Sequence, residues 1–228
     1  DLSTLWQDTA GTTPVTSTGQ LVARIDDKSG RGNHLIQATS AQRPSYQLDG
    51  SRGFLLFDGT DDGLATSGNV NFSGGDEVTV YAGVRVLSSS AFGTIVELST
   101  SSGTNAGTFG MFAANSGNDA SFRSRGSSIV TAISVNNLIA PYTSVFVGRG
   151  DISSDFCNLR SNTSELASVT TDQGSGNFIS SQLFVGRRGG SSAAFNGRLY
   201  GLIVRSVYGT GAAVTTPEAW MNFRTGAY

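Results

Sequence analysis

Alternation of apolar and polar residues is the strongest pattern in the chain. In residues 78–86, Val and Ala residues alternate with Thr79, Tyr81, Gly83 and Arg85. Successive side chains of a strand point to opposite faces. This segment therefore predicts a strand with one face on a core and one wetter face.

Further segments combine a short apolar run with flanking clusters of Gly, Ser and Asn. They are residues 53–57, 94–98, 108–113, 120–123, 129–134, 143–148, 156–160, 165–170, 182–186 and 198–207. Many short strands separated by such turns are typical of a β-sandwich or a β-barrel. Residues 199–205 are apolar on both faces, which predicts a strand covered on both sides. No linker or exact repeat divides the chain, and the polar stretch 99–106 is expected to be an exposed loop. We therefore expect a single domain over residues 1–228.

One short helix is predicted near the end of the chain. Thr216 suits the N-cap position, Pro217 suits the first helical position, and Gly226 suits a C-terminal stop. Trp220 and Phe223 lie about one helical turn apart, so we expect both rings to pack the helix against the sandwich.

Composition and charge narrow the range of partners. The chain has 30 Gly and only 14% charged residues, with 15 basic against 17 acidic side chains and a formal net charge of -2. Binding to phosphates usually needs a basic excess, so we expect no nucleic-acid partner. No apolar run approaches the ~20 residues that cross a bilayer, so we expect no membrane insertion. The first residue is Asp1 rather than Met, which suggests a processed product or an excised domain.

The chain has one cysteine, Cys157, and one histidine, His34. These numbers exclude an intramolecular disulfide and a zinc site built from several Cys or His ligands. We expect Cys157 to be a small buried residue, and a catalytic Cys157–His34 pair is the alternative.

Several motifs follow one another in a fixed order along the chain. They are Trp6-Gln-Asp8, Asp27-Lys-Ser-Gly-Arg-Gly-Asn-His34, Arg43-Pro-Ser-Tyr46, Phe57-Asp-Gly-Thr-Asp-Asp62, Leu183-Phe-Val-Gly-Arg187 and Phe195-Asn-Gly-Arg-Leu199. This ordered set resembles the laminin G-like, concanavalin A-like jelly-roll domains of bacterial and bacteriophage proteins, and the last motif looks most like phage virion or prophage proteins. The resemblance implies an all-β fold, a two-sheet antiparallel jelly-roll sandwich with a short C-terminal helix. It also implies a place on the virion surface or outside the cell, with a cell-surface glycan or other virion proteins as partners.

The acidic residues of these motifs allow two interpretations. Asp27 can cap the amides of Ser29 and Gly30, and Asp58-Gly59 is a strong turn pair. The resemblance also implies a calcium site at the sandwich rim, with oxygen ligands from such loops. The candidate ligands are Asp26, Asp27, Asn33 and Asp58. Many relatives carry an acid in the final strand where this chain has Tyr200-Gly201, so calcium is an optional rather than a required ligand.

The chain lacks the sequence pattern that usually marks catalysis by two carboxylates in this fold. Glycosidases of this fold use a Glu-x-Asp-x-x-Glu strand, which places an acid and a nucleophile about 5 Å apart. The four glutamates, Glu77, Glu97, Glu165 and Glu218, do not form it. A cross-strand pair of Glu97 and Glu165 is the remaining arrangement for a glycoside hydrolase.

Binding is therefore the favoured function, and the chain offers aromatic and cationic candidates for it. They are Tyr81, Arg85, Phe122, Arg123, Arg125, Arg187 and Arg188. Arg123 and Arg125 should share one strand face. We expect a non-catalytic carbohydrate-binding or host-attachment domain. A virion decoration or assembly protein, which could form a homo-oligomer, is the alternative, and a glycoside hydrolase is a further one.

Overall fold

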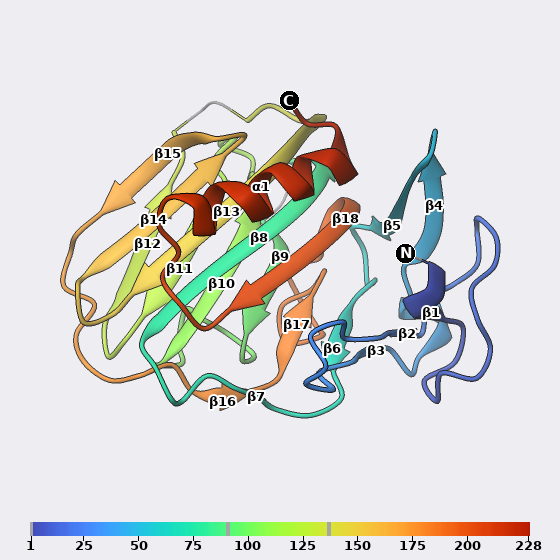
Figure 1. The fold of residues 1–228 in the computed structure, drawn as a ribbon, viewed down its shortest axis with the longest axis horizontal. Helices are drawn as coiled ribbons and strands as arrows, with labels where there is room; N and C mark the ends of the chain where they lie inside the picture. The colour runs from blue at the N-terminus through green and yellow to red at the C-terminus, as the bar shows by residue number, and fades with distance from the viewer. Residues whose placement is uncertain (1, 90–91, 136–137) are drawn as a thin grey trace.

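Two large antiparallel sheets face each other in the computed structural model, which describes residues 2–89, 92–135 and 138–228 (Figure 1). The nine-stranded sheet has the order β1 (Leu5–Trp6), β2 (Arg24–Ile25), β3 (Leu35–Ile36), β6 (Leu64–Thr66), β17 (Leu183–Val185), β9 (Gly93–Leu98), β10 (Thr108–Ala113), β11 (Ser121–Arg125) and β12 (Ile129–Ile133). The seven-stranded sheet has the order β15 (Ser164–Val169), β14 (Phe156–Ser161), β13 (Tyr142–Asp151), β8 (Glu77–Val86), β18 (Asn196–Arg205), β5 (Arg52–Asp58) and β4 (Ser45–Asp49).

A few short elements complete the structure. β7 (Val70–Asn71) pairs with β16 (Ser180–Ser181), and two short 3₁₀ turns span Leu2–Thr4 and Ser40–Gln42. The one α-helix among the described residues, α1, spans Ala212–Thr225. This arrangement is the predicted all-β sandwich with a short C-terminal helix.

In each sheet, a strand from late in the sequence lies between the N-terminal strands and the strands from the middle of the chain. β17 lies between β6 and β9, and β18 lies between β5 and β8. Among the residues that the structure describes, β1 to β6 therefore pair with one another, with β17 and with β18, and not with strands from the middle of the chain. Figure 1 shows these N-terminal strands gathered at one side of the molecule.

Every segment that was predicted to be a strand overlaps a strand in the structure. The prediction works because side chains that point into the core alternate with side chains that point away from it. The core fills the space between the sheets with large apolar side chains, among them Phe57, Phe109, Phe122 and Phe146. Phe122 of β11 reaches across to β13, where Gly148 leaves room for its ring. A Cβ at Gly148 would lie 2.1 Å from that ring.

The prediction of a wetter face on β8 is wrong. Tyr81 and Thr79, which alternate with the core residues, are fully buried. The cause is α1, which lies across β8, β13 and β18 on the outer side of the seven-stranded sheet (Figure 1). The sheet is therefore covered on both faces where the helix crosses it.

The face of α1 that packs on the sheet is not the predicted one. Val214, Glu218, Met221 and Thr225 are buried, whereas Trp220 is 49% and Phe223 79% exposed. Met221 fixes this choice, because its sulfur lies over the paired Gly83 and Gly201, where a Cβ would be 2.9 and 2.8 Å away. The sequence prediction missed this face because it relied on large apolar residues, whereas one of the buried positions is a glutamate, Glu218.

The helix also begins earlier than predicted, at Ala212 rather than after Thr216, and ends as predicted at Gly226, whose φ is 63°. Pro217 is therefore inside the helix, where it lacks the N–H that would bond to the carbonyl of Ala213. The Tyr81 hydroxyl donates to that carbonyl at 2.8 Å, and Arg205 Nη1 donates at 3.3 Å. The strands thus supply the hydrogen bonds that the proline removes.

Buried Glu218 anchors the helix at the β14–β15 edge of the sheet, away from β18. Its carboxylate accepts from the N–H of Thr163 at 2.8 Å and forms an ion pair with Arg160 at 3.4 Å. Within the described residues, no helix has both the length and the apolar character needed to cross a membrane.

Candidate functional site

Two of the predicted arginines meet on the outer face of the nine-stranded sheet. The register of β17, β9, β10 and β11 places Phe184, Glu97, Gly110 and Arg123 in one row across the sheet. Val96, Leu98 and Phe122, which adjoin Glu97 and Arg123 along their strands, lie in the core, so the side chains of Glu97 and Arg123 point outward. Arg188 comes from the loop after β17 and reaches the same place.

A pair of stacked rings forms the floor of this site. Phe112 of β10 lies over Gly110, where a Cβ would be 2.5 Å from the ring. Phe92 stacks on Phe112 with ring centroids 4.4 Å apart and an interplanar angle of 27°. The absence of a side chain at Gly110 therefore allows the aromatic pair to lie close to the sheet.

Both arginines lie against these rings. The guanidinium carbon of Arg123 is 5.2 Å from the Phe92 centroid and 5.0 Å from that of Phe112. The corresponding distances for Arg188 are 5.1 and 5.3 Å. We call Phe92, Phe112, Arg123, Arg188 and Glu97 the arginine–phenylalanine cluster. Cation–π contacts of this kind hold a guanidinium in place while leaving some of its N–H groups free.

Glu97 ties the cluster to the loops above it. Its side chain is fully buried and accepts from Arg188 Nε at 2.9 Å and from both the N–H and the hydroxyl of Ser102 at 2.6 Å. Arg125 Nη1 donates to the carbonyl of Gly103 at 2.6 Å. Residues 99–106 therefore form a loop as predicted, but part of it is buried on the sheet rather than exposed.

Positive charge is in excess at this site. In the described part of the chain, Glu97 is the only carboxylate in an ion pair with Arg123, Arg125 or Arg188, and it pairs with Arg188 alone. The Nε atom of Arg123 and the Nη2 atom of Arg188 are buried without a hydrogen-bond partner among those residues. Burial, and then the charge of Arg188, lowers the pKa of Arg123 below its ordinary value.

The remaining predicted ligand residues lie elsewhere. Tyr81 and Phe122 are fully buried, one under α1 and one in the core, so the prediction that they contact a ligand at the surface is wrong. Arg85 is on the other sheet and donates to Thr143 Oγ1 at 3.4 Å. Arg187 points to a different loop, where it donates to the carbonyls of Asp61 and Ser191.

Two of the predicted calcium ligands are occupied by turn and side-chain contacts. Asp26 accepts from Trp6 Nε1 and from Arg24 Nε, each at 2.7 Å. Asp27 accepts from the N–H of Ser29 at 2.8 Å and from the N–H of Asn33 at 3.0 Å. The predicted cap of Asp27 on the Ser29 amide is therefore present, whereas the second backbone N–H that Asp27 accepts from is that of Asn33 rather than Gly30.

Asp58 belongs to a separate acidic cluster with Asp61 and Asp62. Their carboxylate oxygens lie within 4.8 Å of one another. Burial raises the pKa of Asp62 to about 6, against a hydrogen bond from the Asp58 N–H, and the charges of Asp58 and Asp61 act in the same direction as burial. An all-oxygen set of this kind suits calcium better than a softer metal.

The predicted alternatives for catalysis do not assemble. Glu97 is on β9 of one sheet, whereas Glu165 is on β15 of the other and accepts from Asn158 at 2.7 Å. Cys157 is buried on β14, and its burial raises the pKa of the thiol to about 12. His34 lies beside Asp26 in the N-terminal region. The cross-strand glutamate pair and the Cys–His pair were therefore wrong.

No family model and no curated protein matches this chain, but solved structures do. A heptameric SAP-like pentraxin from Limulus polyphemus has a TM-score of 0.54 at 12% identity, over 72% of this chain and 80% of the pentraxin. An arabinofuranosidase in complex with arabinofuranosyl-α-1,2-xylobiose has a TM-score of 0.64 at 17% identity, over 90% of this chain and 51% of the enzyme. This chain thus spans about half of that enzyme. The CBM40 of the Ruminococcus gnavus IT-sialidase, bound to α2,3-sialyllactose, has a TM-score of 0.50 at 15% identity, over 68% and 97%. These likenesses establish the fold as a concanavalin A-like jelly-roll sandwich.

Proposed function

We propose that this chain is a non-catalytic carbohydrate-binding domain and that the arginine–phenylalanine cluster is its binding site. The observation that carries the proposal is the pair Arg123 and Arg188, held against stacked rings with a single carboxylate between them. Binding sites combine apolar or aromatic surface with a few fixed polar groups. Phe112 is fully buried, so the two guanidinium groups and the half-buried Phe92 are the parts of the cluster that a sugar can contact. The hydroxyl oxygens of a sugar can accept hydrogen bonds from the guanidinium N–H groups.

The charge of the site favours an acidic sugar. Guanidinium groups form short, paired hydrogen bonds to carboxylates. Among the described residues Arg123 forms no ion pair with a carboxylate, although the charge of the nearby Glu97 acts on it. The sialyllactose complex of the CBM40 and the saccharide complex of the arabinofuranosidase support the choice of ligand class for this fold. Host attachment on a phage or other extracellular surface is the setting we propose, following the sequence resemblance.

Binding of α2,3-sialyllactose, compared with neutral lactose, tests the proposal by calorimetry. We expect the acidic sugar to bind more tightly and Arg123→Ala to lower its affinity at least about tenfold, because charge-assisted hydrogen bonds contribute about 1.5–3 kcal/mol. Arg31→Ala, at an exposed loop position, is the matched control and should bind like the wild type.

Melting curves show whether Arg123→Ala is folded, and Arg123→Lys tests geometry at constant charge. Equal binding by wild type and folded Arg123→Ala would refute the site. An array of acidic and neutral glycans extends the test beyond sialic acid, and no binding to any of them would refute the function. Release of new reducing ends from a bound glycan would refute the proposal that the domain is non-catalytic.

Assembly is the second candidate function, favoured by the edge strand β12. Ile129, Ile133 and Val135 are 41%, 47% and 72% exposed, and residues 127–135 carry no charge. Exposed edge strands are usually protected by charges. If the domain assembles through this edge, light scattering will show an oligomer that Ile133→Lys dissociates, whereas a monomeric wild type would remove this candidate.

A further inference from the structure

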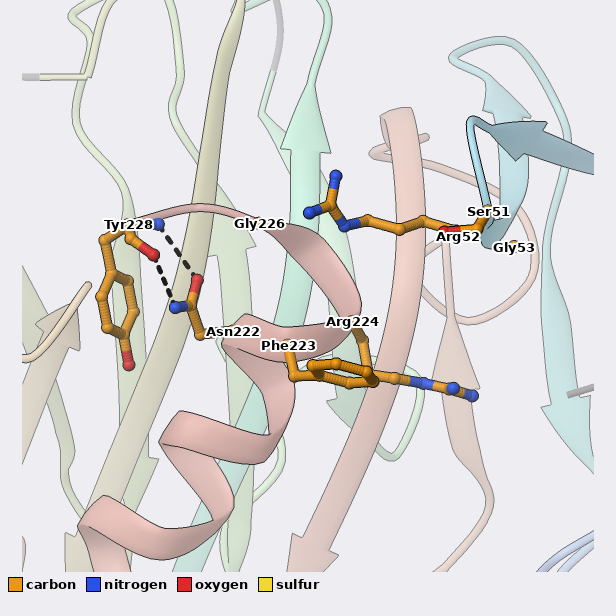
Figure 2. A pocket seen from close by; sticks show the side chains of 8 residues that line it. All are labelled: Ser51, Arg52, Gly53, Asn222, Phe223, Arg224, Gly226 and Tyr228. Carbon is orange, nitrogen blue, oxygen red and sulfur yellow. Dashed lines mark hydrogen bonds between the residues drawn. The ribbon is translucent and has the colours of Figure 1, made fainter.

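Large apolar side chains are exposed beside arginines both at the end of α1 and along β12. The end of α1 forms a hollow of about 350 Å³ with the turn between β4 and β5 (Figure 2). Figure 2 shows the guanidinium groups of Arg52 and Arg224 pointing away from each other there, with Phe223 beside Arg224 alone. These two charges therefore do not converge on one ligand. The edge strand β12, by contrast, combines exposed apolar side chains with free backbone groups.

The outer backbone groups of β12 have no partner strand among the described residues, because β12 is the last strand of the nine-stranded sheet. On the β11 side, the N–H of Ser134 donates to the carbonyl of Ala120. Hydrogen-bonding direction alternates from residue to residue in an antiparallel strand. The N–H and C=O groups of Ile129, Thr131 and Ile133 therefore point to the free edge, where a strand of another chain can pair with them.

The sequence of this edge is symmetric about Thr131. Ile129 lies two residues before it, and Ile133 lies two residues after it. If two copies pair antiparallel about a twofold axis at Thr131, each Ile129 lies directly opposite Ile133 of the second copy. Side chains that are directly opposite in antiparallel strands contact each other, and β-branched residues suit such pairs. The edge is thus complementary to itself.

Charge does not oppose this pairing. Exposed edge strands are usually protected by charged side chains, but residues 127–135 carry no charge. A twofold axis brings the same surface of both copies together, so a charge close to Thr131 would meet a like charge. The pairing would also cover Ile129 and Ile133, which are 41% and 47% exposed. An uncharged, symmetric edge fits a second copy of this chain better than an unrelated strand.

The same axis would place the two arginine–phenylalanine clusters on one continuous surface. Arg123 is the register partner of Thr131. Both side chains point to the outer face, because the adjoining Phe122 and Ala132 lie in the core. One row across the joined sheets then runs from Arg123 through Thr131 of each copy to Arg123 of the second copy. Successive strands are about 4.8 Å apart, so the Cα atoms of the two Arg123 residues would be about 14 Å apart.

We infer that two copies of this chain pair through β12 about a twofold axis at Thr131, and that their joined outer face binds one acidic polysaccharide at both clusters. The pairing follows from β12 alone, whereas the choice of ligand rests on the proposed carbohydrate-binding function. A polysaccharide with acids along its length reaches both clusters, and its second contact benefits from a high effective concentration. A single sugar acid occupies one cluster only.

Cysteine cross-linking tests the pairing and its register. In the dimer Thr131 faces itself with Cα atoms about 5.5 Å apart, which suits a disulfide. Mild oxidation should therefore cross-link Thr131→Cys. Ile133→Cys is the matched control and should stay uncross-linked, because each Ile133 would be about 14 Å from its counterpart. The native Cys157 is fully buried and does not compete.

Light scattering tests the dimer without a cross-link. We expect a dimeric wild type and a monomeric Ile133→Lys. Leu48→Lys replaces a similarly exposed leucine of β4, 49% exposed, and should remain dimeric. Melting curves show whether each variant is folded. A monomeric wild type would overturn the pairing, as would equal cross-linking of the two cysteine variants or none of Thr131→Cys.

Calorimetry with oligomers of α2,8-linked sialic acid and with α2,3-sialyllactose tests the shared ligand. We expect the wild type to bind the oligomer at least about tenfold more tightly than sialyllactose. Ile133→Lys should lose this gain and still bind sialyllactose, and its added positive charge cannot mimic the loss because it favours an acid. An equal gain in Ile133→Lys would overturn the shared ligand. Cross-linking of Thr131→Cys without binding of either glycan would overturn the ligand together with the proposed function, and would support the pairing.

Discussion

Asp62 is a carboxylate that the fold holds in an unfavourable environment. Its pKa is raised to about 6 by burial, and the ordinary value is 3.8. Between these two pH values the folded protein keeps a proton that the unfolded chain has released. The stabilisation from this proton is complete below pH 3.8 and is lost as the pH rises through 6. At neutral pH the charged Asp62 therefore opposes folding.

Asp62→Asn is expected to increase the free energy of unfolding at pH 7.5 by about 1–3 kcal/mol, because each pKa unit corresponds to about 1.4 kcal/mol. The asparagine keeps an oxygen for the hydrogen bond from the Asp58 N–H. At pH 3, below both pKa values, the gain should largely vanish, as chemical denaturation at the two pH values will show. An equal effect at both pH values would contradict the raised pKa.

Calcium should act on the same group of carboxylates. If it binds at Asp58, Asp61 and Asp62, millimolar calcium will raise the melting temperature of the wild type at pH 7.5 and have less effect on Asp62→Asn, because a bound cation offsets the repulsion there. An equal effect on both proteins would place calcium elsewhere.

Helix α1 depends on a hydrogen bond from the sheet at the point where Pro217 interrupts its own. Tyr81→Phe removes the 2.8 Å donor to the Ala213 carbonyl, and we expect a loss of about 1 kcal/mol. In the Pro217→Ala background, the new N–H can donate to that carbonyl, so the cost of Tyr81→Phe should fall. Urea unfolding of the four proteins measures this coupling. Additive effects would show that the proline and the tyrosine act independently.

Docking of the helix depends equally on the bare surface at Gly83. A Cβ there would lie 2.5 Å from Thr225 and 2.8 Å from Met221. Gly83→Ala should therefore lower the free energy of unfolding by about 1–3 kcal/mol through overpacking and increase amide hydrogen exchange in α1. Gly68→Ala, at a position with open space around it, is the matched control.

Sequence patterns predicted elements well where packing follows local periodicity. The strands could be recognised because core residues alternate within each one. The buried face of the helix could not be recognised. Glu218 is buried because it bonds to Thr163 and Arg160, which are distant in sequence. The two-residue strands near the N-terminus are too short to show alternation.

The candidate site was predictable only in part for the same reason. Arg123 and Arg188 were recognised as cations, but their partners Phe92, Phe112 and Glu97 come from separate segments. Only the strand order β17-β9-β10-β11 brings them together. The spacing of residues within a single strand or loop does not predict that strand order.

The insertion of β17 and β18 between earlier strands has a consequence for protein synthesis. In the described part of the chain, β18 is the only strand that pairs with the β4–β5 hairpin, and it ends as late as Arg205. β6 likewise meets β9 only through β17. Neither sheet can close while these late strands are still inside the ribosome. Contacts so distant in sequence also form slowly, and the early strands stay open to chaperones and proteases until translation has almost finished.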